Sequence, residues 1–330
     1  MLWLAGLMGL MAVGAVGVID MGGESDDEET VETTSESTDE AEAPSDAVDA
    51  AMSDEPQAAA QDPAQTFDQR PADTLTLGTD GDDALTGSDA GDTLYGEDGN
   101  DTIDGGDGND TLHGEDGTDQ IDGGAGDDVI TGHNGDDMLA GGDGDDTMQG
   151  SAGADVLKGG DGDDAVHGGL DNDTLVGGDG SDSLFGGWGD DYVSGVEDDP
   201  TTAAIDDIDQ GTDYLNGGGG DDTIVAGEND IVTAGDGEDT IVAGTWIGQG
   251  NAADIIDFDA EDDNILLVYD DAAGDAPDVS LQPDPDDPNT TQVLMDGIAV
   301  ANVLNGAEIT IEDIAIMPLS LAQSAGMAPV

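Results

Sequence analysis

Cysteine is absent from this chain, and basic and aromatic residues are scarce. Without cysteine the chain cannot form disulfides, thiolate metal sites or a cysteine nucleophile. Arg70 and Lys158 stand against 81 acidic residues, so the formal net charge is −79. This charge excludes nucleic acid as a partner, and anionic membrane surfaces repel it. Aromatic residues make up 3% of the chain, which is too little for an ordinary packed core of this length.

The chain is instead rich in glycine and aspartate, arranged in a nine-residue repeat. Thirteen consecutive units run from Gly78 to Ser194 and read G-x-x-G-x-D-x-U-x, where U is apolar. Position 1 is Gly, position 6 is Asp and position 8 is Leu, Ile, Val or Met in every unit, whereas Ala90 and Asp171 replace Gly at position 4. Compositional bias would not hold one aspartate at one offset. The repeat therefore indicates a solenoid built from one supersecondary unit.

Each unit predicts a turn followed by a short strand. Glycine at positions 1 and 4 is typical of turns, because it permits positive φ and close backbone approach. The last three residues, such as Thr111-Leu112-His113, predict a strand whose middle side chain points to one face. Two units then form one coil of 18 residues, with two thin parallel sheets around an apolar filling. The predicted fold is all-β: a parallel β-roll with a small C-terminal β cap and a disordered acidic N-terminal region.

The aspartates at position 6 require a counter-charge. In stacked coils these carboxylates lie about 5 Å apart, and each pair repels by roughly 1 to 3 kcal/mol. Ca²⁺ suits such a site, because it takes six to eight oxygen ligands in flexible geometry, whereas Mg²⁺ demands a tight octahedron. Units i and i+2 lie on the same side of the roll, so thirteen units form eleven pairs and Asp137 serves one site with Asp119 and another with Asp155. The candidate ligands are Asp83, Asp92, Asp101, Asp110, Asp119, Asp128, Asp137, Asp146, Asp155, Asp164, Asp173, Asp182, Asp191, Asp222 and Asp239.

The nonapeptide resembles the calcium-binding, hemolysin-type repeat of the RTX (repeats-in-toxin) family. The likeness covers residues 78–194 and resumes, less regularly, at 211–242, where the position-6 residues are Asp213, Asp222, Asp230 and Asp239. The resemblance implies a parallel β-roll, about eleven or more Ca²⁺ ions held between adjacent turns, and export by a type I secretion system.

Composition divides the rest of the chain into segments. Leu2 to Ile19 is an uncharged apolar run at the lower limit for a membrane span, and it predicts either an anchor or a cleaved signal. Strands are expected at 254–258 and 264–269, a hairpin at 293–304, and a loop at 277–288. The expected segments are an anchor or signal (1–19), a disordered acidic tether (20–76), the RTX β-roll (77–194), a loop insertion (195–210), a second, irregular RTX block (211–250), and a C-terminal β cap that doubles as a candidate type I secretion region (251–330).

No motif of a known catalytic site is found in the sequence. It has no H-E-x-x-H, no nucleophile elbow and no G-K-[ST] phosphate loop. His113 and His167 occupy position 9 three coils apart, about 14 Å, and His133 occupies position 2 of a different turn. We therefore expect all three histidines to be exposed residues of the roll that share no metal.

The sequence favours a non-enzymatic protein that folds when it binds Ca²⁺ outside the cell. Its expected location is extracellular or at the cell surface, where residues 2–19 would anchor it, and its role would be structural or adhesive. The sequence identifies no protein or glycan partner. The alternative is a polyanionic calcium buffer or salt-adaptation coat without specific recognition. Cooperative folding on Ca²⁺ distinguishes the first hypothesis from the second.

Overall fold

The structure, a computed structural model, describes residues 75–196, 211–272, 274–304, 309–325 and 327. The expected anchor at 1–19, nearly all of the tether at 20–76, and residues 197–210 of the loop insertion lie outside these ranges. Within the described ranges, no helix has the length and apolar character needed to cross a membrane.

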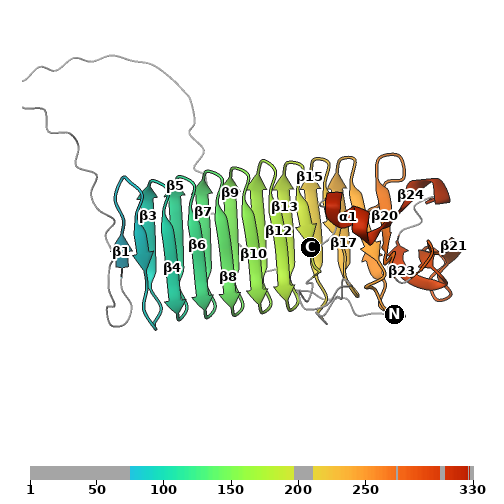
Figure 1. Cartoon of the computed structure of the whole chain (residues 1–330), viewed down its shortest axis with the longest axis horizontal. Helices are drawn as coiled ribbons and strands as arrows, with labels where there is room; N and C mark the ends of the chain where they lie inside the picture. Colours follow the sequence, from blue (N-terminus) through green and yellow to red (C-terminus); the bar gives the residue numbers. More distant parts are fainter. Residues whose placement is uncertain (1–74, 197–210, 273, 305–308, 326, 328–330) are drawn as a thin grey trace, which may run out of the picture. The chain divides into compact units, whose positions relative to one another are not determined.

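Successive strands alternate between two sheets, so that every second strand is a neighbour in space (Figure 1). The first sheet has thirteen strands, in the spatial order β1 (Leu75–Leu77), β3 (Thr93–Asp98), β5 (Thr111–Asp116), β7 (Val129–Asn134), β9 (Thr147–Ala152), β11 (Ala165–Leu170), β13 (Ser183–Trp188), β15 (Tyr214–Gly219), β17 (Ile231–Asp236), β19 (Ala253–Ile255), β23 (Ile298–Val303), β22 (Thr291–Met295) and β21 (Val279–Pro283). The second sheet has eleven, in the order β2 (Ala84–Thr86), β4 (Thr102–Asp107), β6 (Gln120–Ala125), β8 (Met138–Asp143), β10 (Val156–Asp161), β12 (Thr174–Asp179), β14 (Tyr192–Ser194), β16 (Thr223–Val225), β18 (Thr240–Gly244), β20 (Asn264–Tyr269) and β24 (Ile314–Pro318).

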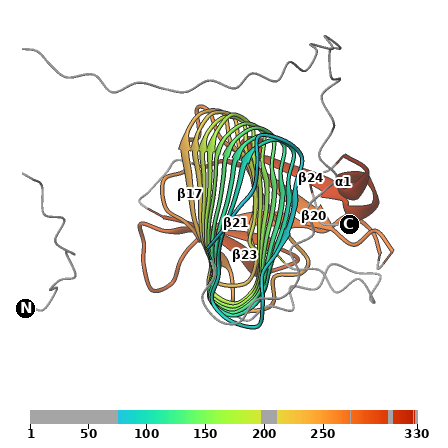
Figure 2. The same ribbon diagram turned by 90° about the vertical axis from the view of Figure 1, so that its left-hand side faces the viewer.

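The predicted parallel β-roll is confirmed. Neighbouring strands in the regular region pair in parallel with an offset of 18 residues, as in Leu94 opposite Leu112. Figure 2 looks along the stack and shows the coils superimposed, with the two sheets facing each other. Every position-8 side chain from Leu85 to Val193 points between the sheets and is at most 2% exposed. Because each regular strand contributes one such side chain, the apolar filling is one thin row per sheet. Burial of each side chain contributes about 2 kcal/mol.

The strands are longer than the repeat predicted. A typical strand, such as β5, covers six residues, because pairing continues from position 9 through positions 1 to 3 of the next unit. Positions 1 to 3 were expected to form part of the turn. Glycine there does not end the strand, since backbone groups rather than side chains form the ladder. The true turn is therefore short, at positions 4 to 6.

The stack continues across the insertion. Leu184 of β13 pairs with Leu215 of β15, an offset of 31 residues, and the following coil returns to an offset of 17. Residues on both sides of the insertion thus occupy equivalent positions in adjacent coils. The irregular block extends the same roll.

A mixed cap follows the last coil. β19 pairs with β23 in parallel, and β23, β22 and β21 then form an antiparallel meander, which contains the hairpin expected at 293–304. In the other sheet β24 pairs with β20, a 3-10 turn at Ile311–Asp313 precedes β24, and helix α1 (Leu319–Ala325) contacts both strands.

Two segments differ from the expected organisation. Residues 277–288 were expected to be a loop, but β21 lies within them, because Val279 and Leu281 alternate with polar residues and pack against the core. Leu75 and Thr76 were assigned to the tether, but they belong to β1 and pair with β3. Both strands use a sheet edge that would otherwise have unpaired backbone groups.

Candidate metal centre in the aspartate columns

The position-6 aspartates are buried although they are acidic. From Asp92 to Asp191 each is at most 3% exposed, and Asp83, at the start of the roll, is 9% exposed. Alternation along the strand explains this placement, because position 6 lies two residues before the inward-facing position 8. Asp110, Leu112 and Gly114 thus face inward, whereas Thr111 and His113 face outward. Burial of a carboxylate is costly unless it is hydrogen-bonded and neutralised.

Hydrogen bonds connect these aspartates into two columns. In each of the eleven predicted pairs, the backbone N–H of one aspartate donates to Oδ1 of the aspartate one coil further on, at 2.6–2.8 Å. Asp137 contacts both expected neighbours: Asp119 donates to it, and it donates to Asp155, both at 2.8 Å. The structure therefore brings together the aspartates that the i, i+2 pairing predicted.

We call these the long column and the short column. The long column links Asp83, Asp101, Asp119, Asp137, Asp155, Asp173, Asp191, Asp222, Asp239 and Asp263. The short column links Asp92, Asp110, Asp128, Asp146, Asp164, Asp182, Asp213 and Asp230. Asp213, Asp230 and Asp263 were not among the candidate ligands. Asp263 follows the point where the nonapeptide period is lost, so no sequence signal indicated it.

The second carboxylate oxygen is different from the first. Within the described residues, Oδ2 is buried and has no hydrogen-bond donor in Asp101, Asp110, Asp119, Asp128, Asp137, Asp146, Asp155, Asp164, Asp173, Asp191, Asp222 and Asp239. A buried acceptor without a donor costs about 1 to 3 kcal/mol, and more when it is charged. These oxygens therefore require a cation or a proton.

Beside most of these oxygens lie a position-1 glycine and a backbone carbonyl from the next coil. A Cβ built on Gly105 would lie 2.5 Å from Asp110 Oδ2 and 2.5 Å from the carbonyl oxygen of Gly123. The same close approach recurs along both columns, which explains why position 1 is glycine in all thirteen regular units. Carboxylate and carbonyl oxygens are the donors that Ca²⁺ prefers, so the residues present fit a calcium ion.

The ends of both columns differ from the middle. Asp83 Oδ2 accepts from the backbone N–H and hydroxyl of Thr79, and Asp92 Oδ2 accepts likewise from Ser88, at 2.6–2.9 Å. At the other end, Asp230 Oδ2 accepts from Gly227 N–H at 2.6 Å. Local donors thus satisfy Oδ2 of these terminal aspartates, whereas the Oδ2 atoms named above in the middle of the columns have no such donor. Thr or Ser at position 2 of the first two units was the available sequence signal.

Burial raises the pKa values of the middle aspartates. For Asp137, Asp164 and Asp173 burial, reinforced by neighbouring carboxylates, raises the pKa from 3.8 to about 7, although the backbone N–H donor opposes the shift. Asp101 and Asp128 are raised to about 6 for the same reasons. A divalent cation beside Oδ2 would lower these pKa values by stabilising the charged form.

The structure corrects the placement of the histidines. His113 lies at position 9 of β5, and the strand register puts His133, at position 2 of β7, diagonally beside it. Their rings approach to 3.2 Å between His113 Nδ1 and His133 Nε2. The two residues belong to different units, and the contact was not expected, because the predicted strand ended at position 9 whereas β5 and β7 pair beyond it. His167 stacks instead on Phe185, with ring centroids 4.9 Å apart.

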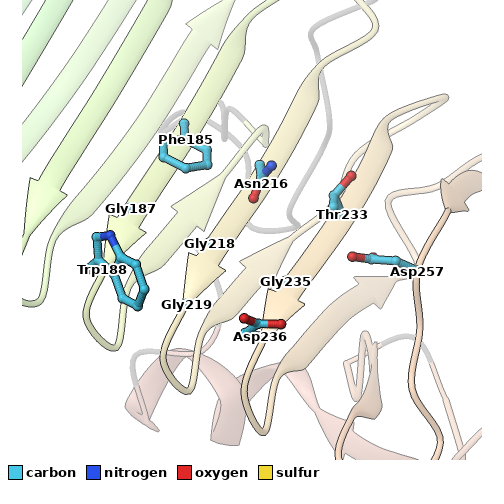
Figure 3. Close-up of a pocket in the computed structure, with 10 residues that line it drawn as sticks. All are labelled: Phe185, Gly187, Trp188, Asn216, Gly218, Gly219, Thr233, Gly235, Asp236 and Asp257. Carbon is cyan, nitrogen blue, oxygen red and sulfur yellow. The ribbon is translucent and has the colours of Figure 1, made fainter.

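A shallow groove of about 390 Å³ lies on the outer face of the first sheet, across β13, β15 and β17 (Figure 3). Its floor is the glycine row at position 2, Gly187, Gly218 and Gly235, which are neighbours in register. The position-9 and position-3 side chains rise on either side and form its walls. Phe185 is 39% exposed and Trp188 is 70% exposed, and the polar lining includes Asn216, Thr233, Asp236 and Asp257.

Stacked coils with a carboxylate and a carbonyl oxygen at each step define a cation-binding parallel β-roll. Comparison with known families agrees: the profile described as "RTX calcium-binding nonapeptide repeat (4 copies)" matches residues 77–112, 113–148, 140–175, 167–201 and 208–241. The chain belongs to the RTX nonapeptide-repeat β-roll proteins, and its repeats are calcium-binding repeats.

Other comparisons add little. No curated protein matches the chain. Among solved structures, one similar chain is the extracellular lipase LipA from Serratia marcescens, with 14% sequence identity and a TM-score of 0.21. That alignment covers 76% of this chain and 41% of the lipase chain.

Proposed function

We propose that this protein is a secreted or cell-surface β-roll that folds on binding Ca²⁺ outside the cell and has a structural or adhesive role rather than an enzymatic one. The row of buried Oδ2 atoms without donors supports this proposal best. Each oxygen requires a positive charge, and Ca²⁺ would supply two at each step of a column. Because the unfolded chain holds no such site, the binding free energy becomes folding free energy.

The calcium ligands would be the position-6 carboxylates and the carbonyl oxygens of the position-1 glycines. The middle aspartates, from Asp101 to Asp191, together with Asp222 and Asp239, offer an oxygen without a donor or lie in the same column as those that do. Asp83 and Asp92 would join sites only by exchanging their Thr79 and Ser88 donors for the ion. We expect about eleven or more ions at saturation.

A calcium titration of the full chain by far-UV circular dichroism tests the proposal. We expect a cooperative gain of β signal with Ca²⁺ and none with Mg²⁺ at equal concentration. At the low free calcium of a cytosol the repeats should be unfolded, and at millimolar external calcium they should be folded. A β signal already complete in chelator would contradict folding on calcium.

The alternative, a polyanionic buffer or salt-adaptation coat, predicts a different response. Sodium chloride at about 1 M shortens the Debye length to roughly 3 Å and screens exposed charge, but it does not neutralise buried carboxylates. We therefore expect NaCl not to replace Ca²⁺ in the titration. Folding by NaCl alone, or calcium uptake without a change in β signal, would favour the alternative.

The groove on the first sheet favours the adhesive form of the role. Exposed Phe185 and Trp188 rings beside Asn216 and two carboxylates resemble the mixture of apolar face and hydrogen-bonding groups that suits a sugar ring (Figure 3). We expect Trp188→Ala to abolish binding of the calcium-loaded protein on a glycan array. Tyr214→Ala is the matched control, because Tyr214 is 55% exposed but does not line the groove. Equal binding by both variants would exclude this site.

Export is proposed to depend on the segments outside the regular repeats. Residues 251–330 would act as cap and type I secretion region, and residues 2–19 as anchor or signal. Deletion of each segment, followed by measurement of the protein in medium, membrane and cell fractions, distinguishes the two routes. Secretion that survives the loss of 251–330 would remove type I export from the proposal.

A further inference from the structure

His113, Glu115 and His133 form a cluster on the outer face of the first sheet. His113 and Glu115 are two residues apart on β5, and Glu115 pairs in register with His133 on β7. All three side chains point away from the core and are half-buried. The cluster is therefore separate from the aspartate columns, which face inward.

The spacing of the ligand atoms suits one small metal ion. One atom from each of the three side chains lies within 4.8 Å of the other two. The His113 Nδ1 to His133 Nε2 distance is 3.2 Å, and His133 Nε2 lies 3.8 Å from Glu115 Oε1. Two nitrogens each about 2.05 Å from a tetrahedral zinc ion lie roughly 3.3 Å apart, so little movement is needed to close the site.

The backbone at this cluster is unusual. Glu115 and His133 have φ of 77° and 80°, a region that favours glycine, and so have Glu97 and Ser151 in the strands on either side. In the second sheet position 2 is glycine in every unit from Gly106 to Gly178. Side chains held at positive φ cost free energy and are often found at functional sites. These four side chains occupy the position-2 row of the first sheet, and glycines in the same row form the floor of the groove further along.

We propose that His113, Glu115 and His133 bind a divalent first-row transition metal, with Zn²⁺ as the best fit. Two imidazoles and one carboxylate are a known zinc ligand set, and they leave a coordination position open to water or to a ligand from a partner. Ca²⁺ does not compete well, because it prefers oxygen donors. The Tyr95 ring, stacked on His113 with centroids 4.5 Å apart, holds the imidazole in place.

The test uses the full chain saturated with Ca²⁺, so that the carboxylates of the columns are occupied before zinc is added. The chain has only three histidines, so the test follows the ring signals of each by proton NMR. We expect one equivalent of Zn²⁺ to shift the ring signals of His113 and His133 and to leave those of His167 unchanged. Equal responses of all three rings would overturn the proposal, because scattered binding to acidic residues would explain them.

Calorimetry of variants gives a second measurement. His113→Ala and His133→Ala should each lower zinc affinity by roughly tenfold or more, since loss of even an outer-shell partner costs about 10- to 100-fold. His167→Ala is the matched control. Like His113, His167 occupies position 9 and stacks on an aromatic ring, but it lies outside the cluster. Circular dichroism in Ca²⁺ verifies that each variant is folded. Wild-type affinity in His113→Ala, or an equal loss in His167→Ala, would overturn the proposal.

Discussion

In the middle of each column, a position-6 aspartate uses its two carboxylate oxygens differently. For Asp137, Oδ1 accepts the backbone N–H of Asp119 in the preceding coil, which fixes the carboxylate, and Oδ2 is buried without a hydrogen-bond donor. The first oxygen is satisfied by the protein alone, whereas the second requires a cation or a proton. A single residue type thus joins adjacent coils and, under the proposed function, makes their stability depend on Ca²⁺.

Asp137→Asn tests this division at the residue scale. The amide retains an acceptor for the Asp119 N–H but places a donor or a neutral oxygen where the cation requires charge. Because Asp137 belongs to two adjacent sites, we expect the midpoint of the calcium titration to rise roughly tenfold, which corresponds to about 1.4 kcal/mol.

Asp143→Asn is the control for that prediction. It removes the same charge from an exposed position-3 residue of β8 and should leave the midpoint nearly unchanged. Equal shifts in the two variants would mean that net charge, rather than the column, sets calcium affinity. An unchanged midpoint in Asp137→Asn would contradict the i, i+2 model.

At the scale of the element, each strand of the regular roll from β2 to β14 contributes one buried apolar side chain to the core. Leu139 of β8 is 2% exposed, and its neighbour Met138 is 54% exposed on the other face. Because a coil contacts only the coils beside it, a cavity at Leu139 cannot be filled from elsewhere. We expect Leu139→Ala to destabilise the calcium-loaded roll by about 2 to 5 kcal/mol.

Met138→Ala should change stability by no more than about 0.5 kcal/mol, because its side chain is mostly in solvent. Urea unfolding at saturating Ca²⁺ measures both variants. Similar losses in the two would mean that the apolar row does not hold the coils together.

At the scale of the whole molecule, the raised pKa values make the calcium-free roll sensitive to pH. The folded pKa values of Asp137, Asp164 and Asp173 are about 7, above the value near 3.8 of an unperturbed aspartate. The folded state therefore binds more protons than the unfolded state between about pH 4 and 7. Stability from these groups is fully present below pH 4 and is lost as pH rises through 7.

Without calcium, we expect the β signal to increase as the pH falls from 7.5 to 4. With calcium, the direction reverses: protons compete for the same oxygens, so the calcium midpoint should rise as the pH falls from 7.5 to 5.5. Circular dichroism across this range, in calcium-free buffer and in a calcium series, measures both effects. A calcium-free β signal that grows with rising pH would contradict the raised pKa values.

The order of the repeat determined the fold and most of both columns. Strict Gly, Asp and apolar positions predicted the roll, the two sheets and the i, i+2 aspartate pairs, because a period of nine residues leaves one register in which the apolar residues meet. The family comparison matches the same repeats. Extension of the strands through positions 1 to 3 was missed, since glycine in a sequence indicates a turn whether or not its backbone joins a ladder.

Only the tertiary structure brought together residues that follow no period. Asp263 completes the long column from beyond the repeats. His133 reached His113 because two strands align position 2 beside position 9, and the groove opened where three glycines fall in one row. Local spacing thus determined the period of the solenoid, whereas contacts between coils decided which side chains meet, because these depend on strand register and on the length of each strand.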